Sequence, residues 1–264
     1  GVESIRELEQ AVMGLEFVAD NVMIYYSMLA EEEKAVFWEE YLTFRISQPG
    51  GVFASQIDVL ENFDDFVLLT KIKQTENTEE LATAIAACED YGLSESNSYD
   101  LYLGKGEFTD GELNENQKTA LLEAVFAKKS SYKTLTEFVE DFLDKTVLYA
   151  CYESGSKYLL NSVLTNSDRI VEDKLGKFAN LNTEAKLSVC VDILRQHKLF
   201  ESIDALSFAV SKASDRSETD GGSGGAGGGS LGGSKNDKEG KPAGSIVIEE
   251  QISESVKFTD LQDA

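Results

Sequence analysis

Proline, cysteine and histidine are all scarce in this chain, and each scarcity limits what it can be. Only Pro49 and Pro242 occur among the 264 residues. Long stretches without proline suit helices, because a proline inside a helix removes a backbone hydrogen bond and clashes with the preceding turn. The sequence also has no long apolar run of the kind that crosses a bilayer, so it predicts no membrane-spanning helix.

The three cysteines indicate neither a disulfide framework nor a zinc site. Their number is odd, and the sequence contains no Cys-x-x-Cys motif. Cys88, Cys151 and Cys190 each stand among apolar residues in a helical pattern. We therefore interpret them as small buried hydrophobic residues rather than as reactive thiols.

Basic residues are outnumbered: the chain has 24 Lys and Arg against 48 Asp and Glu, a formal net charge of −24. Nucleic-acid binding depends on cationic side chains that neutralise phosphates, so this charge argues against a nucleic-acid partner. It argues equally against an anionic membrane surface. Such acidity is typical of a protein that stays soluble on a crowded exterior. No segment has the spacing of an EF-hand calcium loop, and we predict no metal and no cofactor.

No catalytic motif is recognisable. The single histidine, His197, lies in the polar segment Arg195–Lys198, and no motif places a nucleophile or an orienting carboxylate beside it. We interpret it as an exposed turn residue. The acidic run Glu31–Glu33 is better explained as the first turn of a helix, where the helix dipole favours negative charge. The sequence therefore predicts a protein that is not an enzyme, with no catalytic, cofactor-binding or metal-binding residue.

The only tryptophan admits two interpretations. Trp38 follows Phe37 and precedes Tyr41 by three residues, and both neighbours occupy positions that we expect to face inward. We favour a partly buried residue on the flank of a helix. The alternative is an exposed platform for a glycan.

One pattern recurs three times, near residues 29–66, 113–150 and 181–212. The second and third copies keep every spacing, whereas a short insert containing Pro49 and Gly50 delays the aromatic residue of the first. The recurring positions are Leu29, Lys34, Phe37, Tyr41, Phe53, Ser55, Val59 and Phe63 in the first copy; Leu113, Lys118, Leu121, Val125, Tyr132, Thr134, Phe138 and Phe142 in the second; and Leu181, Lys186, Val189, Ile193, Phe200, Ser202, Leu206 and Val210 in the third.

Each copy reads as two helices joined by a tight turn. In the middle copy, Asn114 and Gln117 have the spacing of a capping box, and Thr134 with Glu137 begins a second helix in the same way. The polar turn Lys128–Ser131 separates the two. Amphipathic helices with so short a connection pack antiparallel as a hairpin. The aromatic residue before the second cap occupies the position of a hydrophobic staple.

Further helical segments flank the first copy. Residues 3–28 carry apolar side chains every three or four positions, which predicts an amphipathic helix. Another helix begins at Asn77 or Thr78 and runs toward Gly92, which we expect to be its C-terminal cap.

The remaining segments complete an all-α prediction. We expect residues 93–112 to form a long loop with at most one helical turn, and residues 156–178 to hold one or two short helices. Residues 1–214 then form one helical domain. Its three copies stack as a repeat array or bundle, because units of this size cannot bury their apolar faces alone.

The composition changes after residue 214. Gly221–Ser234 is almost entirely glycine and serine, and the charged run Lys235–Lys241 follows it. We predict a flexible linker over residues 215–244, because such a composition cannot offset its ordering entropy by burial. No Gly-Lys-Ser/Thr motif is present, so these glycines do not indicate a phosphate-binding loop. Residues 245–264 are predicted to be extended.

The segment Val256–Ala264 resembles the opening of an S-layer homology domain, a family that begins with a Phe-x-Asp-Leu/Val pattern. Here the pattern reads Phe258-Thr259-Asp260-Leu261. The family continues through a tryptophan-bearing helix and occurs in tandem at the ends of bacterial surface proteins. Only the opening is present here, so no polysaccharide-binding residue is carried over. The order of segments is similar to that of clostridial-type surface proteins: a helical region comes first, then a Gly/Ser linker, and then this motif.

The resemblance implies an extracellular protein that is anchored to cell-wall polysaccharide through a C-terminal domain. The helical region would be a non-catalytic module with a structural or partner-binding role, and a protein partner would bind on the stacked helices. Two alternatives stay open. A cell-wall-active enzyme, such as a glycan hydrolase, predicts a deep pocket with paired carboxylates of perturbed pKa. An intracellular helical scaffold is the other. The recurring Lys34, Lys118 and Lys186 are expected to pair with neighbouring acids.

Overall fold

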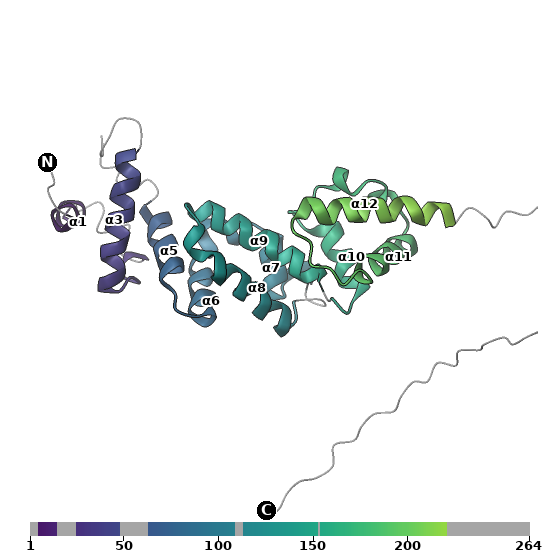
Figure 1. Ribbon diagram of the computed structural model, residues 1–264, viewed down its shortest axis with the longest axis horizontal. Helices are drawn as coiled ribbons and strands as arrows, with labels where there is room; N and C mark the ends of the chain where they lie inside the picture. Colours follow the sequence, from purple (N-terminus) through teal and green to yellow (C-terminus); the bar gives the residue numbers. More distant parts are fainter. Residues whose placement is uncertain (1–4, 15–24, 48–62, 109–112, 153, 221–264) are drawn as a thin grey trace, which may run out of the picture. The chain divides into compact units, whose positions relative to one another are not determined.

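The structure is a computed structural model, and it describes residues 5–14, 25–47, 63–108, 113–152 and 154–220. The chain divides into two units, Gly1–Gly224 and Gly225–Ala264, and all of the described residues lie in the first. Those residues form helices joined by turns, with no strand among them (Figure 1). The all-α fold predicted from the sequence is therefore confirmed for the described part of the chain.

The N-terminal helices enclose a cluster of aromatic side chains. Helix α1 (Ile5–Met13) packs on α3 (Glu31–Ser47), and α3 packs on α5 (Phe63–Gln74). Aromatic pairs stabilise a core by about 0.5–1.5 kcal/mol each beyond the area that they bury. The buried members of this cluster are Val12, Tyr26, Leu29, Phe37, Trp38, Tyr41, Phe63, Phe66 and Val67.

Two stretches near the N-terminus are described only in part. The helix predicted over residues 3–28 is described as α1, which is followed by a turn at Gly14; residues 15–24 lie outside the described residues. Residues 48–62 also lie outside them. The predictions for Phe53, Ser55 and Val59, which fall in that stretch, therefore stay predictions.

Helix α6 (Thr78–Ala87) begins as predicted but ends earlier. The side chain of Asn77 caps it by accepting hydrogen bonds from two backbone N–H groups of its first turn. We expected Gly92 to be the C-terminal cap, but Cys88 is the capping residue. Gly92 lies instead in the following turn, η1 (Glu89–Leu93), with a φ of 100° that glycine adopts without strain. Gly92 thus provides a left-handed backbone conformation, as expected, but in the turn that follows α6 and not at the helix end.

Residues 93–112 are more ordered than the long loop that the sequence predicts. Helix α7 (Asn97–Leu103) and the short η2 (Gly106–Phe108) occupy much of this stretch, while residues 109–112 lie outside the described part. Ser96 caps α7 through its hydroxyl, and the buried side chains of Tyr99 and Leu101 anchor it. A helix of two turns offers too few apolar positions to show a helical period, so the sequence pattern concealed it.

The middle copy forms the hairpin that its sequence predicts. Helix α8 (Glu115–Lys128) begins at a complete capping box: the Asn114 side chain accepts from the Gln117 N–H at 3.0 Å, and the Gln117 side chain accepts from the Asn114 N–H at 2.9 Å. The turn η3 (Lys129–Ser131) leads into α9 (Leu135–Cys151), which Thr134 caps. Helices α8 and α9 pack against each other.

Gln117 also joins the two ends of this hairpin. Its Nε2 donates to the carbonyl oxygens of Tyr149 at 2.9 Å and Tyr152 at 2.8 Å, at the C-terminal end of α9. One side chain thus satisfies orphan groups at the start of one helix and at the end of the next. The matching position in the first copy is Glu33. Its carboxylate accepts from the backbone N–H three residues earlier at 2.6 Å and pairs with Lys71 of α5 at 2.9 Å.

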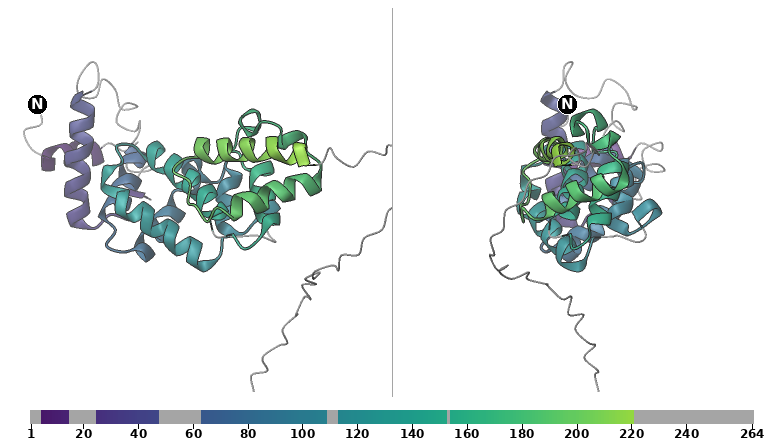
Figure 2. Two further views of the ribbon diagram at one scale, coloured as in Figure 1. Left: turned by 45° about the vertical axis from the view of Figure 1, so that its right-hand side comes forward. Right: turned by 90° about the vertical axis from the view of Figure 1, so that its right-hand side faces the viewer.

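The C-terminal part contains the short helices expected over residues 156–178 and then a longer pair. Helix α10 (Lys157–Asn166) precedes the turns η4 (Glu172–Leu175) and η5 (Phe178–Asn180). Helices α11 (Thr183–Leu194) and α12 (Ile203–Asp220) then lie side by side (Figures 1 and 2).

The predicted start of the linker, at residue 215, is wrong. Helix α12 continues through residues 215–220 and ends immediately before Gly221. Those six residues are polar but include no glycine or proline, so they extend the helix without needing a buried face. The predictions for residues 221–264 lie outside the described residues.

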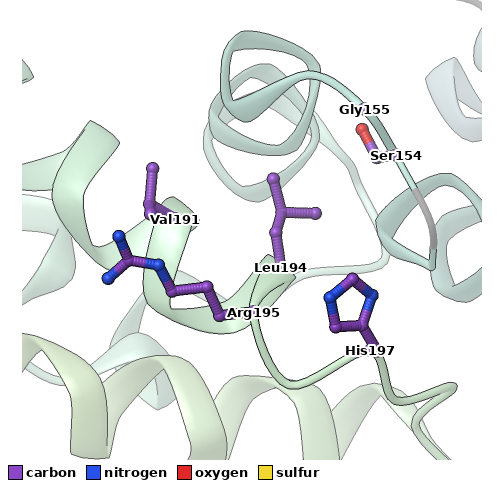
Figure 3. Close-up of a pocket in the computed structure, with 6 residues that line it drawn as sticks. All are labelled: Ser154, Gly155, Val191, Leu194, Arg195 and His197. Carbon is purple, nitrogen blue, oxygen red and sulfur yellow. The ribbon is translucent and has the colours of Figure 1, made fainter. Parts of the chain in front are cut away.

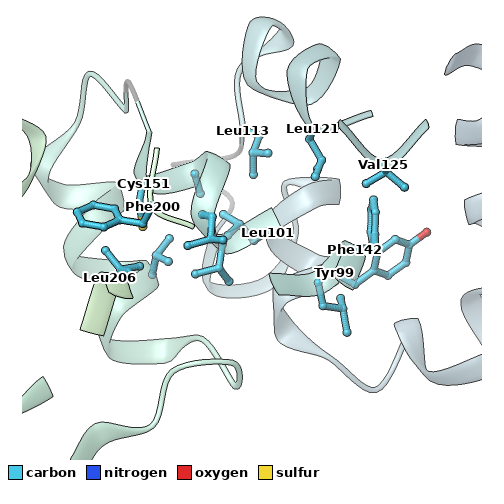
Figure 4. Packing of buried hydrophobic residues seen from close by; sticks show 14 of the residues in the cluster. Tyr99, Leu101, Leu113, Leu121, Val125, Phe142, Cys151, Phe200 and Leu206 are labelled. Atoms are coloured by element: carbon cyan, nitrogen blue, oxygen red, sulfur yellow. The ribbon is translucent and has the colours of Figure 1, made fainter. Parts of the chain in front are cut away.

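Helix α9 is the centre of the larger hydrophobic core, because it contacts α5, α7, α8, α10 and α12. Figure 4 shows Phe142 of α9 near Val125 and Tyr99 at one end of this core. At the other end Cys151 lies beside Phe200 and Leu206. Full burial of one such side chain contributes roughly 1.5–3 kcal/mol.

Candidate functional site

The only histidine lines an open cavity. This cavity of about 480 Å³ lies between the last turn of α11 and the segment that precedes α10 (Figure 3). Val191 and Leu194 give it an apolar wall, and the His197 imidazole lies on the same side as Leu194 (Figure 3). Ser154 and Gly155 line the opposite side, and Arg195 extends away from the imidazole.

The geometry at His197 fits a turn residue. Its φ is 45°, in the left-handed region, its backbone N–H donates to the carbonyl of Leu194 at 3.1 Å, and its side chain is exposed. The sequence-based interpretation is confirmed. The nearby hydroxyl of Ser154 donates to the backbone carbonyl of Ser156 at 3.0 Å. None of the described residues that line the cavity is a carboxylate, so no base-and-orienter pair is assembled among them.

Two carboxylates at the start of α5 have perturbed pKa values. Burial raises the pKa of Asp64, against a hydrogen bond from the Tyr91 hydroxyl at 2.8 Å that lowers it. Its other oxygen is buried without a hydrogen-bond partner. Burial also raises the pKa of Asp65. Consecutive helical residues do not face each other, so these two acids do not form the opposed pair that an acid–base hydrolase needs.

Asp141 is the centre of a network on α9. Burial raises the pKa of its carboxyl, but the pKa is lowered overall because Lys128 and Tyr132 donate hydrogen bonds to it and Lys145 lies nearby. Lys128 is 2.8 Å away, and the Tyr132 hydroxyl is 2.5 Å away. This network joins the end of α8 to the middle of α9, and we assign it a stabilising role.

The cysteines are buried, as the sequence predicts. Burial raises the pKa of the Cys88 and Cys190 thiols to about 12 and raises that of Cys151 as well. A thiol is nucleophilic only as the thiolate, so these three are poor nucleophiles at neutral pH.

Both interpretations of Trp38 are wrong, since its side chain is only 1% exposed. It belongs to the N-terminal aromatic cluster. Its indole N–H donates to the hydroxyl of Tyr26 at 2.8 Å, and that hydroxyl donates to Glu9 at 2.6 Å. Helix α3 packs against α1 as well as α5, so the flank on which Trp38 lies is covered.

The recurring lysines pair with neighbours on their own or an adjacent turn. Pairing with an acid was expected, and it is confirmed for the first two copies but is not the contact seen in the third. The contacts are Lys34 with Glu31 at 2.5 Å, Lys118 with Glu115 at 4.0 Å, and Lys186 over the ring of Phe178 at 5.5 Å. Ion pairs three residues apart on a helix, such as those of Lys34 and Lys118, stabilise it by only about 0.2–0.5 kcal/mol.

The described residues contain no group of three or more His, Cys, Asp or Glu side chains arranged to hold a metal ion. None of the described helices is both long and apolar enough to cross a membrane.

Comparison of the chain with protein-family models, with curated proteins and with solved structures gives no match.

Two features of the structure were not predicted from the sequence. One is the contact between Asp64 and Tyr91, which are 27 residues apart, and no local pattern could reveal it. The other is Phe208, which is exposed on α12 between the inward positions Leu206 and Val210. The spacing of the inward positions alone predicts that Phe208 does not face the core.

Proposed function

We propose that this chain is a non-catalytic helical module of a bacterial cell-surface protein, with a structural or partner-binding role outside the cell. In this proposal three degenerate helix-turn-helix copies stack along the module. The Gly/Ser linker joins it to a wall anchor of the S-layer homology type, which binds cell-wall polysaccharide.

The pairing of helices supports the repeat. The second and third copies match the pairs α8 and α9, and α11 and α12, whereas the first copy takes in α3 and only the beginning of α5; the members of each pair pack together. Residues at matching positions are buried in all three copies. They are Phe37, Leu121 and Val189 at one position, Tyr41, Val125 and Ile193 at the next, and Phe63, Phe142 and Val210 in the second helix.

The burial of these matching positions is the observation that best supports a structural or partner-binding role. Apart from the three lysines, the described recurring residues serve as caps and core positions, which supports a repeat that builds a scaffold over one that repeats a chemical site. A stack of this kind offers an extended surface to a partner. The large excess of acidic residues and the Phe-x-Asp-Leu pattern at Phe258 support the surface location.

Cell fractionation tests the location. An antibody against the helical region should detect the full-length protein in the wall fraction of the source organism, and a wash with a denaturant should release it without breaking covalent bonds. Recovery from the cytosol alone would refute the proposal. A cytosolic marker protein run on the same fractions controls for lysis.

A further inference from the structure

Helix α5 belongs to both hydrophobic cores. Phe63 and Phe66 are buried in the N-terminal aromatic cluster, whereas Leu69 and Ile72 are buried in the larger core. Tyr25, which precedes α3, packs against both cores. The first turn of α5, together with Tyr25 and η1, therefore forms the junction that joins the N-terminal helices to the rest of the described chain.

Asp64, the second residue of α5, lies at this junction with one oxygen unsatisfied. Its Oδ2 accepts a hydrogen bond from the Tyr91 hydroxyl of η1 at 2.8 Å, while its Oδ1 is buried and has no hydrogen-bond partner. Buried polar atoms without a partner are rare in native proteins, and each one needs a physical explanation. Burial without a donor costs a charged carboxylate far more than it costs a neutral carboxyl group.

The other groups at the junction do not compensate the charge of Asp64. Asp65 adjoins it on α5, and the ring of Tyr25 packs edge-on against that of Tyr91, with the centroids 5.2 Å apart. The Tyr25 hydroxyl donates to Asp90 of η1 at 3.5 Å. Within the described part of the chain, Asp64, Asp65 and Asp90 form no ion pair with a lysine, arginine or histidine. Three acids and two phenols thus meet there without a cation.

Charged groups on the elements that pack against α5 have partners of their own. The thiol of Cys88, after α6, interacts with Asp65 but is buried and neutral at ordinary pH. The remaining contacts are Glu33 of α3 with Lys71 at 2.9 Å, Glu40 of α3 with Lys73 at 2.9 Å, Lys129 of η3 with the carbonyl of Thr75, and Asp141 of α9 with Lys128 and Lys145.

The electrostatics at Asp64 favour its protonated form. Burial raises the pKa of Asp64, the hydrogen bond from Tyr91 lowers it, and the charge of Asp65 raises it again, with a net increase. Burial and the carboxylate of Asp64 raise the pKa of Tyr91, so its hydroxyl remains a donor at neutral pH. A carboxyl group whose pKa is higher in the folded state stabilises that state below its unfolded pKa, and this contribution is lost as the pH rises through the folded pKa.

We propose that Asp64 makes the junction a pH-sensitive contact, in which η1 is held firmly on the start of α5 when the carboxyl group carries a proton and less firmly when it is ionised. Separation of η1 from α5 hydrates both oxygens of Asp64, so the open state favours the carboxylate and the closed state favours the acid. Acidification therefore tightens the attachment of the N-terminal helices. This property goes beyond the proposed role of the module and does not depend on where the chain is located.

Urea unfolding of the 264-residue chain between about pH 4 and pH 8 tests the proposal. Trp38 is the only tryptophan and is buried in the N-terminal aromatic cluster, so its fluorescence reports on the helices that the junction attaches. Asp64→Asn keeps the shape of the protonated side chain but cannot ionise. We expect the unfolding midpoint of the variant to rise relative to that of the wild type as the pH increases from 4 to 7.

Glu79→Gln is the matched control. Glu79 is the second residue of α6, as Asp64 is of α5, but its side chain is exposed. Because ionisation of an exposed carboxyl group carries no burial cost, this variant should not gain on the wild type as the pH rises.

Tyr91→Phe tests the same contact from the η1 side. It removes the hydroxyl that donates to Asp64. A carboxylate needs that donor more than a neutral carboxyl group does, so the substitution should lower the unfolding midpoint more at pH 7 than at pH 4. Far-ultraviolet circular dichroism verifies that each variant folds.

Two results would overturn the inference. One is a difference between Asp64→Asn and the wild type that stays constant from pH 4 to pH 7, and the other is a loss from Tyr91→Phe that is the same at both pH values. The two variants change opposite sides of one contact, so either alone can refute the proposal. The cell fractionation described above measures a different property, so the location and the pH-sensitive contact can each fail independently.

Discussion

Gly176, in the turn between η4 and η5, offers a stability test with a large expected effect. Its φ of 62° and ψ of −124° fall in a region that only glycine adopts freely. A Cβ at this position would lie 2.3 Å from Oγ and 3.1 Å from Cβ of Ser211 on α12. Backbone strain of this kind costs about 1–3 kcal/mol. Overpacking against α12 adds about 1–3 kcal/mol. We therefore expect Gly176→Ala to lower the free energy of unfolding by roughly 2–6 kcal/mol.

Urea unfolding, followed by far-ultraviolet circular dichroism, measures this change. Gly155→Ala is the matched control, because nothing lies within 4 Å of its added methyl group and its φ is not in the left-handed region. It should be neutral, or stabilising by about 0.4–1 kcal/mol through a less flexible unfolded state. Adding Ser211→Ala to Gly176→Ala removes the closest atom and should restore part of the loss. A Gly176→Ala effect below about 0.5 kcal/mol would refute the reasoning, since ordinary surface substitutions reach that value.

Three smaller predictions follow from the caps, the charges and the thiols. Asn114→Ala should lower the free energy of unfolding by about 1 kcal/mol in the same assay, because it removes the cap of α8. Asn114→Asp should retain the cap, so equal losses from the two variants would contradict the capping role. The folded pKa of Asp141 lies below its unfolded value, so its stabilising effect is present above the unfolded pKa and is lost as the pH falls through the folded one. The stability of Asp141→Asn should therefore decline less steeply than that of the wild type below about pH 4, and parallel pH profiles would argue against this. A chromogenic disulfide reagent should label none of the three thiols in the native chain and all of them in denaturant, and rapid native labelling would show that burial does not protect them.

Local signals predicted the local structure well. The capping box at Asn114, the cap at Thr134, the turn at residues 128–131 and the inward positions of the middle copy all depend on residues that are close in sequence, and these predictions are confirmed. Asn77 is a further example, since its side chain and its partners lie within one helical turn.

The predictions that failed depend on tertiary contacts or on weak periodicity. Trp38 is buried because α1 covers the far side of α3, and no local pattern shows which neighbour will cover a flank. Helix α7 is anchored by two buried apolar side chains, Tyr99 and Leu101, in a segment whose glycines suggested a loop. Residues 215–220 carry no apolar stripe, but they continue α12 because nothing in them breaks a helix.

The surface features needed the structure for the same reason. The hollow that Val36, Phe66 and Ser131 line combines α3 and α5 with the turn before α9, which are distant in sequence. Only the position of Phe208 could be read from spacing.

The double role of Gln117 has a consequence for cooperativity. Its side chain holds the start of α8 and the end of α9 at once, so opening either end exposes groups that belong to both. Glu33 joins α3 to α5 in a similar way. The third copy has Ala185 at this position, whose side chain can make neither link. The first two hairpins therefore have a side-chain link between their helices that the third hairpin lacks. We expect the backbone amides at the start of α11 to exchange with solvent before those at the start of α3 or α8.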